Sequence, residues 1–178
     1  MTTVSLDGRH VQLAQAMAEV AHRGQRDKLG APYIGHPLSV MARVEAELQA
    51  QGVPGMVREV RCPALIVALL HDVIEDTPVG LEELRPWFGD EVVEALDAIS
   101  RRPRETYHDY IERVAANPLA RRVKLCDLAD NLEPRRLEQL DEPTRRRLRA
   151  KYERALEVLR PGSLGIGPAH SEAQRGGL

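Results

Sequence analysis

The chain has 178 residues, of which 43% are hydrophobic and only 3% aromatic, and its formal net charge at pH 7 is −2. This length fits a single domain with a substantial core, and the near-neutral charge excludes an overall positive field that would attract DNA or RNA. The N-terminal residues lack the apolar segment of a signal peptide, and the longest apolar run, at 64–70, is too short to span a bilayer, so we expect a cytoplasmic protein without membrane or nucleic-acid partners.

Apolar residues recur at helical spacing through the first half of the chain. The pattern predicts a helix over 11–25 and a second one that starts at His36–Pro37 and runs to about Gln51. A third helix is expected to hold the apolar run at 64–70 and to continue to about Thr77, because a residue before proline is forced out of the helical region. With so few aromatic residues, the core must be built from Leu, Val, Ala and Ile, which suits helices packed on helices.

The second half of the chain continues the helical pattern. A capped helix start is predicted at VGLEEL, and further helices are predicted at 90–100, 105–116, 118–132 and 142–159. The pair Trp87–Phe88 is expected to lie in the core. The stretch 161–178 is rich in Gly, Pro and Ser without apolar periodicity. We therefore predict an all-α fold, with one compact multi-helix domain at 1–160 and a disordered tail at 161–178.

Four ionisable residues follow directly after the apolar run: His71, Asp72, Glu75 and Asp76. On a helix, the pairs spaced four apart lie one turn from each other, so all four side chains share one polar edge. Three carboxylates on that edge repel one another, and the helix C-terminus disfavours negative charge further. A divalent metal ion would remove this repulsion, because imidazole nitrogen and carboxylate oxygen both bind such ions.

A single helix supplies only adjacent corners of a coordination sphere, so other ligands must come from distant segments. His36 is one candidate, because it ends the turn-forming stretch GAPYIGHP. Asp127 is another, since it interrupts the mostly apolar helix predicted at 118–132. Asp130 interrupts the same helix, and we expect it to cap the helix or to pair with an arginine. The cysteines, Cys62 and Cys126, are expected to be buried thiols of a reducing compartment.

Four ordered blocks of the sequence together suggest a family. The blocks AHRGQ, GAPYIGHP, ALLHDVIEDT and VKLCDLADN resemble the motifs of the HD-domain metal phosphohydrolases in order and in approximate spacing. More narrowly, the chain resembles the hydrolase domain of RelA/SpoT proteins and its stand-alone relatives from about Ala21 to Leu132. This resemblance implies an HD-domain fold and a (p)ppGpp pyrophosphohydrolase, which removes the 3′-pyrophosphate from guanosine tetra- and pentaphosphate.

The resemblance also implies roles for individual residues. It implies that one divalent ion, usually manganese in this family, is bound by four ligands: His36, His71, Asp72 and Asp127. The catalytic pair beside the attacking water would be Glu75 and Asp76. Residues matching positions near the nucleotide are Lys28, Tyr33 and Asn131. Lys124, close in sequence to the aspartate of its motif, is a further candidate to neutralise a pyrophosphate.

Two positions depart from the family pattern. Long RelA/SpoT proteins carry an arginine that stacks on guanine where this chain has Asp27, and an arginine commonly stands where this chain has Leu128. A carboxylate cannot stack as a planar cation does, and it repels phosphate. Two alternatives therefore stay open: a phosphohydrolase of another nucleoside phosphate, and a catalytically silent module that binds metal and nucleotide. The sequence does not indicate an oligomeric state.

Overall fold

The computed structural model describes residues 4–51 and 57–160. Its helices in chain order are α1 (Gly8–Ala21), α2 (Gly35–Ala50), α3 (Val57–Leu70), α4 (Val73–Asp76), α5 (Leu81–Ile99), α6 (Tyr107–Ala116), α7 (Pro118–Asn131), α8 (Pro134–Leu137) and α9 (Glu142–Leu159). Within the described ranges, the β-type pairing is confined to an isolated antiparallel bridge between Arg26 and Pro32. The prediction of an all-α fold is confirmed, whereas the tail predicted at 161–178 lies outside the described residues and the domain boundary at 160 stays a prediction.

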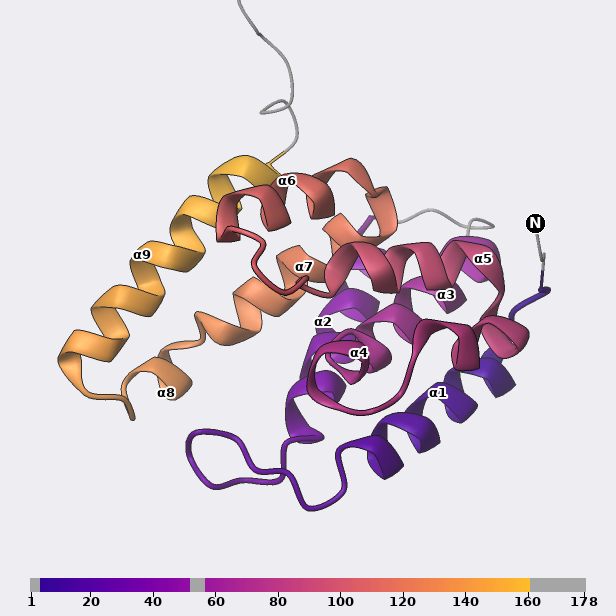
Figure 1. Cartoon of the computed structure of the whole chain (residues 1–178), viewed down its shortest axis with the longest axis horizontal. Helices are drawn as coiled ribbons and strands as arrows, with labels where there is room; N and C mark the ends of the chain where they lie inside the picture. The colour runs from indigo at the N-terminus through magenta and orange to yellow at the C-terminus, as the bar shows by residue number, and fades with distance from the viewer. Residues whose placement is uncertain (1–3, 52–56, 161–178) are drawn as a thin grey trace, which may run out of the picture.

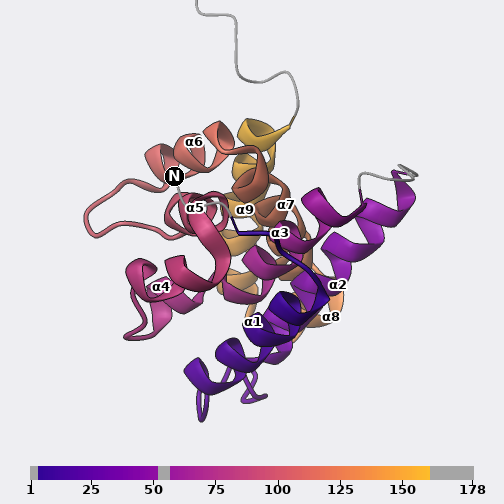
Figure 2. The same cartoon turned by 90° about the vertical axis from the view of Figure 1, so that its right-hand side faces the viewer.

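Helix α3 lies at the centre of the molecule. Every side chain from Ala64 to Leu70 is at most 3% exposed, and α3 contacts α1, α2, α5 and α7 (Figure 2). Burial of a Leu or Ile side chain stabilises the fold by roughly 1.5–3 kcal/mol, so this apolar run is a major source of stability. The turn that follows α3 is thereby anchored directly to the core.

Helices α6, α7 and α9 pack together on one side of the molecule, and α8 leads from α7 into α9 (Figure 1). Side-chain caps define where these helices begin. Asn117 accepts the backbone N–H groups of Leu119 and Ala120 at the start of α7, and Asp141 accepts that of Thr144 at the start of α9. No helix in the described part of the chain has both the length and the apolar character needed to span a bilayer.

The single helix expected from the apolar run to Thr77 is interrupted in the structure. Helix α3 ends at Leu70, α4 begins at Val73, and the two residues between them, His71 and Asp72, form a turn. In a continuous helix, successive side chains point about 100° apart. The turn instead lets both side chains point toward the same place, which decides the geometry of the site described below.

Helix α5 changes direction at Gly89, where φ is 76° and ψ is 179°. This backbone conformation favours glycine, and the second half of α5 starts at Asp90 as predicted. Phe88 is 1% exposed, in agreement with the predicted core position. The same prediction is wrong for Trp87, which is 51% exposed, because this part of α5 buries the face that carries Leu84 and Phe88, four residues apart, and Trp87 lies off that face.

Candidate metal centre and its pocket

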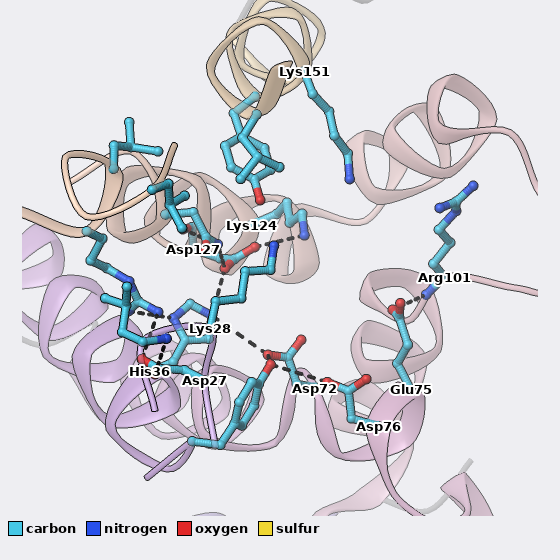
Figure 3. A pocket seen from close by; sticks show the side chains of 18 of the residues that line it. Asp27, Lys28, His36, Asp72, Glu75, Asp76, Arg101, Lys124, Asp127 and Lys151 are labelled. Atoms are coloured by element: carbon cyan, nitrogen blue, oxygen red, sulfur yellow. Dashed lines mark hydrogen bonds and ion pairs between the residues drawn. The ribbon is translucent and has the colours of Figure 1, made fainter. Parts of the chain in front are cut away.

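Four side chains from three parts of the chain converge at one point. His36 lies in the first turn of α2, His71 and Asp72 in the turn after α3, and Asp127 in α7. Nε2 of His36 lies 3.0 Å from Oδ1 of Asp127 and 3.7 Å from Oδ2 of Asp72. Nε2 of His71 lies 3.1 Å from Oδ2 of Asp72 and 3.8 Å from Oδ1 of Asp127. Figure 3 shows His36, Asp72 and Asp127 around this point.

The cluster is buried and its donor set suits a metal ion. His36, His71 and Asp127 are 7%, 2% and 3% exposed, and one donor atom from each lies within 4.8 Å of the other two. Nδ1 of His71 donates to the carbonyl oxygen of Ala68 at 2.8 Å, while its Nε2 is buried without a hydrogen-bond partner. Two imidazole nitrogens and carboxylate oxygens in such an arrangement fit a divalent transition-metal ion.

The electrostatics of the cluster favour positive charge. Burial opposes ionisation of Asp127, but Lys124 and His36 hold the pKa of its carboxyl well below the usual value. Burial also opposes protonation of His36, yet its hydrogen bonds to Asp127 and Asp130 raise its pKa to about 9. Buried carboxylates that stay ionised require nearby cations, and a divalent ion is a compact source of such charge.

Tyr33 connects this cluster to the acidic pair in α4. Its hydroxyl donates to Oδ2 of Asp72 at 2.6 Å and lies 3.2 Å from Oδ2 of Asp76. Burial and then the negative charge of Asp72 raise the pKa of Tyr33, so the phenol remains a protonated donor. The sequence placed Tyr33 near a nucleotide, and the structure places its hydroxyl against two carboxylates.

Glu75 and Asp76 face different partners. Oε2 of Glu75 accepts the backbone N–H of Arg101 at 3.1 Å, whereas Asp76 turns toward Asp72 (Figure 3). Burial, followed by the charge of Asp72, raises the pKa of Asp76 above its ordinary value. The two carboxylates are therefore not equivalent, although they are adjacent in the sequence.

The loop that carries Arg101 is held by Arg113 of α6. The Arg113 guanidinium makes two hydrogen bonds to Glu105, at 2.9 and 2.7 Å, and donates to the carbonyl oxygens of Asp97 and Ser100 at 2.6 and 2.9 Å. A cation at these carbonyls also compensates the negative end of α5. The position of Arg101 beside Glu75 is thereby fixed by α5 and α6.

Lys124 and Asn131 both contact the Asp127 carboxylate. Nζ of Lys124 lies 2.8 Å from Oδ2, and the Asn131 amide donates to Oδ1 at 2.6 Å and to the backbone oxygen of Asp127 at 3.0 Å. Spacings of three and four residues place these side chains on one face of α7. Both residues also line the pocket, together with His36, Asp72 and Asp127.

A cavity of about 530 Å³ opens over the cluster. Asp72 and Asp127 line it, and so do Lys28, Arg101 and Lys151. In Figure 3, Lys151 points down from α9 toward the cavity that Lys28 enters from the loop after α1. Burial lowers the pKa of Lys151, and Lys124 and Arg101 lower it further. Several cationic side chains around one cavity suit a ligand with several phosphate groups.

The two departures from the family pattern have structural explanations. Asp27 accepts the backbone N–H groups of Leu29 and Ala31, both at 2.9 Å, so its carboxylate shapes the loop that carries Lys28. Leu128 is fully buried in the core. The residue at position 128 therefore cannot contact a ligand in this pocket.

His22 and Asp130 have contacts that the sequence did not indicate. The His22 ring is 3% exposed and lies 4.9 Å from that of Tyr33, and its Nδ1 is 2.7 Å from Oε1 of Gln25. The predicted pairing of Asp130 with an arginine is confirmed, since Nη1 of Arg136 donates to it at 2.6 Å. The additional contact of Asp130 with Nδ1 of His36 was not predicted, because it joins α7 to α2.

Comparisons with known proteins agree with this geometry. A family model described as HD domain matches residues 14–155. The chain is 36% identical over 138 residues to a GTP pyrophosphokinase of Streptomyces coelicolor, and this alignment covers 72% of the chain and 15% of the relative. It is 34% identical over 131 residues to a guanosine-3′,5′-bis(diphosphate) 3′-pyrophosphohydrolase of Aquifex aeolicus, and this alignment covers 69% of the chain and 17% of the relative. It is 30% identical over 174 residues to the bifunctional (p)ppGpp synthase/hydrolase SpoT of Escherichia coli, which covers 93% of this chain and 23% of SpoT.

The chain therefore spans less than a quarter of the length of these relatives. The fold is similar to a solved structure of a metazoan ortholog of SpoT, a protein described as hydrolysing ppGpp, with a TM-score of 0.71, 24% identity and 89% of each chain covered. The match of the family model over most of the chain confirms the relationship that the four motifs predicted. The chain belongs to the HD-domain family.

Proposed function

We propose that this chain is a metal-dependent pyrophosphohydrolase that removes the 3′-pyrophosphate from guanosine 3′,5′-bis(diphosphate), with Mn²⁺ as the metal ion. The observation that carries the proposal is the convergence of two histidines and two aspartates at a cavity that lysine and arginine side chains also line. The names of the relatives support the choice of substrate. Some relatives are named GTP pyrophosphokinase, and the metal cluster favours the hydrolase among these activities.

In this proposal the metal ligands are His36, His71, Asp72 and Asp127. A divalent ion bound there lowers the pKa of water and stabilises negative charge on a phosphorus centre. The Asp127 carboxylate is held through both of its oxygens, because Lys124 contacts Oδ2 while His36 lies beside Oδ1. The ligand carboxylates are thereby oriented before any substrate enters.

Glu75 and Asp76 are the proposed catalytic carboxylates. Asp76 shares the Tyr33 hydroxyl with Asp72, so its carboxylate lies next to a proposed ligand, where it can accept a proton from water. Glu75 is bound to the backbone of Arg101, which keeps that loop next to the cavity. This division assigns proton transfer to Asp76 and assigns to Glu75 the alignment of water and of the cationic loop.

Four cations at the cavity are the proposed substrate contacts: Lys28, Arg101, Lys124 and Lys151. Lysine and arginine side chains attract phosphate oxygens more strongly in a partly buried site than in bulk water. Tyr33 and Asn131 line the same cavity, and we assign them to shaping it through their contacts with Asp72 and Asp127.

A substrate panel with purified, Mn²⁺-loaded protein tests this proposal. Release of pyrophosphate from guanosine tetraphosphate, with no product in the presence of a chelator, is the expected result. Asp72→Ala is expected to lose metal and turnover together, whereas Glu75→Ala is expected to retain metal and lose turnover. Wild-type metal content and rate in Asp72→Ala would contradict the proposed ligand set.

A second candidate function is hydrolysis of a different nucleoside phosphate or pyrophosphate. The observation that favours it is Asp27, whose carboxylate lies in the cavity wall 4.0 Å from Nη2 of Arg136. An acidic group at this edge disfavours a phosphate there and alters the recognition of the base. Inertness toward guanosine tetraphosphate combined with turnover of another nucleotide in the panel would support this second function.

A further inference from the structure

Asp130 is a buried carboxylate that contacts the nitrogen of His36 facing away from the metal cluster. It is 2% exposed, and its Oδ2 lies 2.9 Å from Nδ1 of His36. An ionised carboxylate can only accept hydrogen bonds, so Nδ1 carries the hydrogen and donates it. The other ring nitrogen, Nε2, faces Oδ1 of Asp127 at 3.0 Å. We propose that Asp130 is a positioning residue that fixes the tautomer and the ring orientation of His36 for metal binding, an inference that rests on the metal centre of the proposed function.

The carboxylate of Asp130 is itself held from several sides. The Ser39 hydroxyl and Nε of Arg43, at 3.2 Å, both donate to Oδ1, while Nη1 of Arg136 donates to Oδ2 at 2.6 Å. These donors come from α2 and α8, whereas Asp130 belongs to α7. Two guanidinium groups keep the buried carboxylate ionised and prevent it from rotating. Asp130 is therefore a rigid acceptor, as the orientation of a metal-binding imidazole requires.

His71 shows the same division between its two ring nitrogens. Its Nδ1 donates to the Ala68 carbonyl oxygen at 2.8 Å, and its Nε2 faces Asp72 at 3.1 Å. Both histidines thus use Nδ1 for a fixed acceptor and present Nε2 to the cluster. They differ in the acceptor, because a backbone carbonyl serves His71 and a charged side chain serves His36. A charged acceptor increases the basicity of the ligand, and unlike a carbonyl it can be removed by substitution.

A purely structural role for Asp130 predicts a different outcome. In that case the carboxylate only ties α7 to α2 and α8, and its loss lowers stability without a specific change in metal affinity. Glu133→Gln provides a matched control, because Glu133 joins the same network through Nη2 of Arg43 at 2.6 Å. The control disturbs the ion pairs around Arg43 and leaves the contact between Asp130 and His36 in place.

The test measures metal binding and the state of the His36 ring without substrate. Mn²⁺ titration calorimetry is carried out on the full chain, on Asp130→Ala, on the isosteric Asp130→Asn and on Glu133→Gln. We expect Asp130→Ala to bind Mn²⁺ about 10- to 100-fold more weakly, Asp130→Asn to fall between it and the wild type, and Glu133→Gln to keep the wild-type affinity. In ¹⁵N-histidine-labelled protein loaded with Zn²⁺, the His36 Nδ1–H signal is expected to be shifted downfield in the wild type and to lose that shift in Asp130→Ala.

Wild-type Mn²⁺ affinity in Asp130→Ala, or an equal loss of affinity in Glu133→Gln, would overturn the inference. If Asp130→Ala does not fold, as judged by thermal unfolding in chelator, Asp130→Asn decides in the same way. Neither measurement uses a nucleotide. A protein that leaves guanosine tetraphosphate intact but shows the Asp130 effect would refute the proposed substrate while leaving the role of Asp130 standing.

Discussion

Replacement of Lys124 by methionine tests the electrostatic account of the metal centre. The Lys124 ammonium lies 2.8 Å from Oδ2 of Asp127 and 5.2 Å from the centre of the Tyr110 ring, and the two charged side chains are 14% and 5% exposed. Methionine keeps an unbranched apolar stem and removes only the charge. The Lys124→Met variant therefore leaves a buried carboxylate with one cation fewer.

The size of the effect follows from the contacts that remain. Removal of one partner of a buried ion pair costs about 3–5 kcal/mol. Asp127 still accepts from Asn131 at 2.6 Å and faces Nε2 of His36 at 3.0 Å, so we expect about 3 kcal/mol of lost stability in the metal-free protein. For a chain of this length, that loss lowers the unfolding midpoint by roughly 6–12 °C.

Saturation with Mn²⁺ should make this loss smaller. The Lys124 ammonium lies beside the proposed ligand Asp127, and like charges a few ångströms apart repel by several kcal/mol at an effective dielectric constant of about 20, so this lysine would oppose the binding of a divalent ion. We therefore expect Lys124→Met to bind Mn²⁺ at least about tenfold more tightly than the wild type. The variant loses stability both in the metal-free protein and at saturating Mn²⁺. The difference between these two losses must equal RT times the logarithm of the ratio of the Mn²⁺ affinities of variant and wild type, which is at least about 1.4 kcal/mol.

Urea unfolding in chelator and in excess Mn²⁺ measures the two stability losses, and titration calorimetry measures the two Mn²⁺ affinities. Lys151→Met is the control, because the Lys151 ammonium lies 4.1 Å from the centre of the Tyr107 ring in the same cavity. Its loss is expected to cost about 0.5–1 kcal/mol with or without metal. A Lys124→Met variant as stable as the wild type in chelator, or one destabilised further by Mn²⁺, would refute the reasoning.

Two further predictions concern groups around the site. Tyr33→Phe removes the donor shared by Asp72 and Asp76, and because hydrogen bonds to charged groups contribute about 1.5–3 kcal/mol, we expect urea unfolding in chelator to show a loss of about 2 kcal/mol. An unchanged urea midpoint would show that the phenol does not hold these carboxylates. The Arg113 hydrogen bonds lower the pKa of Glu105 from 4.5 to about 2, so their stabilisation is present above pH 4.5 and is lost as the pH falls toward 2. Glu105→Gln should therefore be less stable than the wild type near neutral pH, and their urea midpoints should converge across that window; a constant difference would contradict the assignment.

Much of the fold follows from local sequence signals. The helix predicted at 142–159 matches α9 because Asp141 caps it and a proline follows in its first turn. The first helix, predicted at 11–25, instead occupies Gly8–Ala21, since Asp7 and His10 form a reciprocal cap one turn earlier than expected. The usual capping box has Glu or Gln at the third helical position, so a cap with histidine there was not recognised and the helix start was predicted three residues too late.

The site was predictable as a set of residues but not as a set of contacts. The resemblance of the four motifs to the HD-domain family implied the four proposed ligands, and the cost of ionisable groups next to an apolar run pointed to the same cluster at His71 and Asp72. The contacts of Lys124 and Asn131 with Asp127 lie within α7 at spacings of three and four, so the helical pattern already allows them. The contact of Tyr33 with Asp72 joins the loop after α1 to the turn after α3, and a single sequence contains no local signal for that packing.

The turn between α3 and α4 explains why the two carboxylates of the acidic pair, Glu75 and Asp76, have different contacts. If the helix continued through position 72, Glu75 and Asp76 would extend the same polar edge as the ligands. The turn instead directs Asp76 toward Asp72 and leaves Glu75 to bind the backbone of Arg101. Substitution of Asp76 should therefore act first on the geometry of the proposed ligand Asp72, whereas substitution of Glu75 should act first on the loop that brings Arg101 to the cavity.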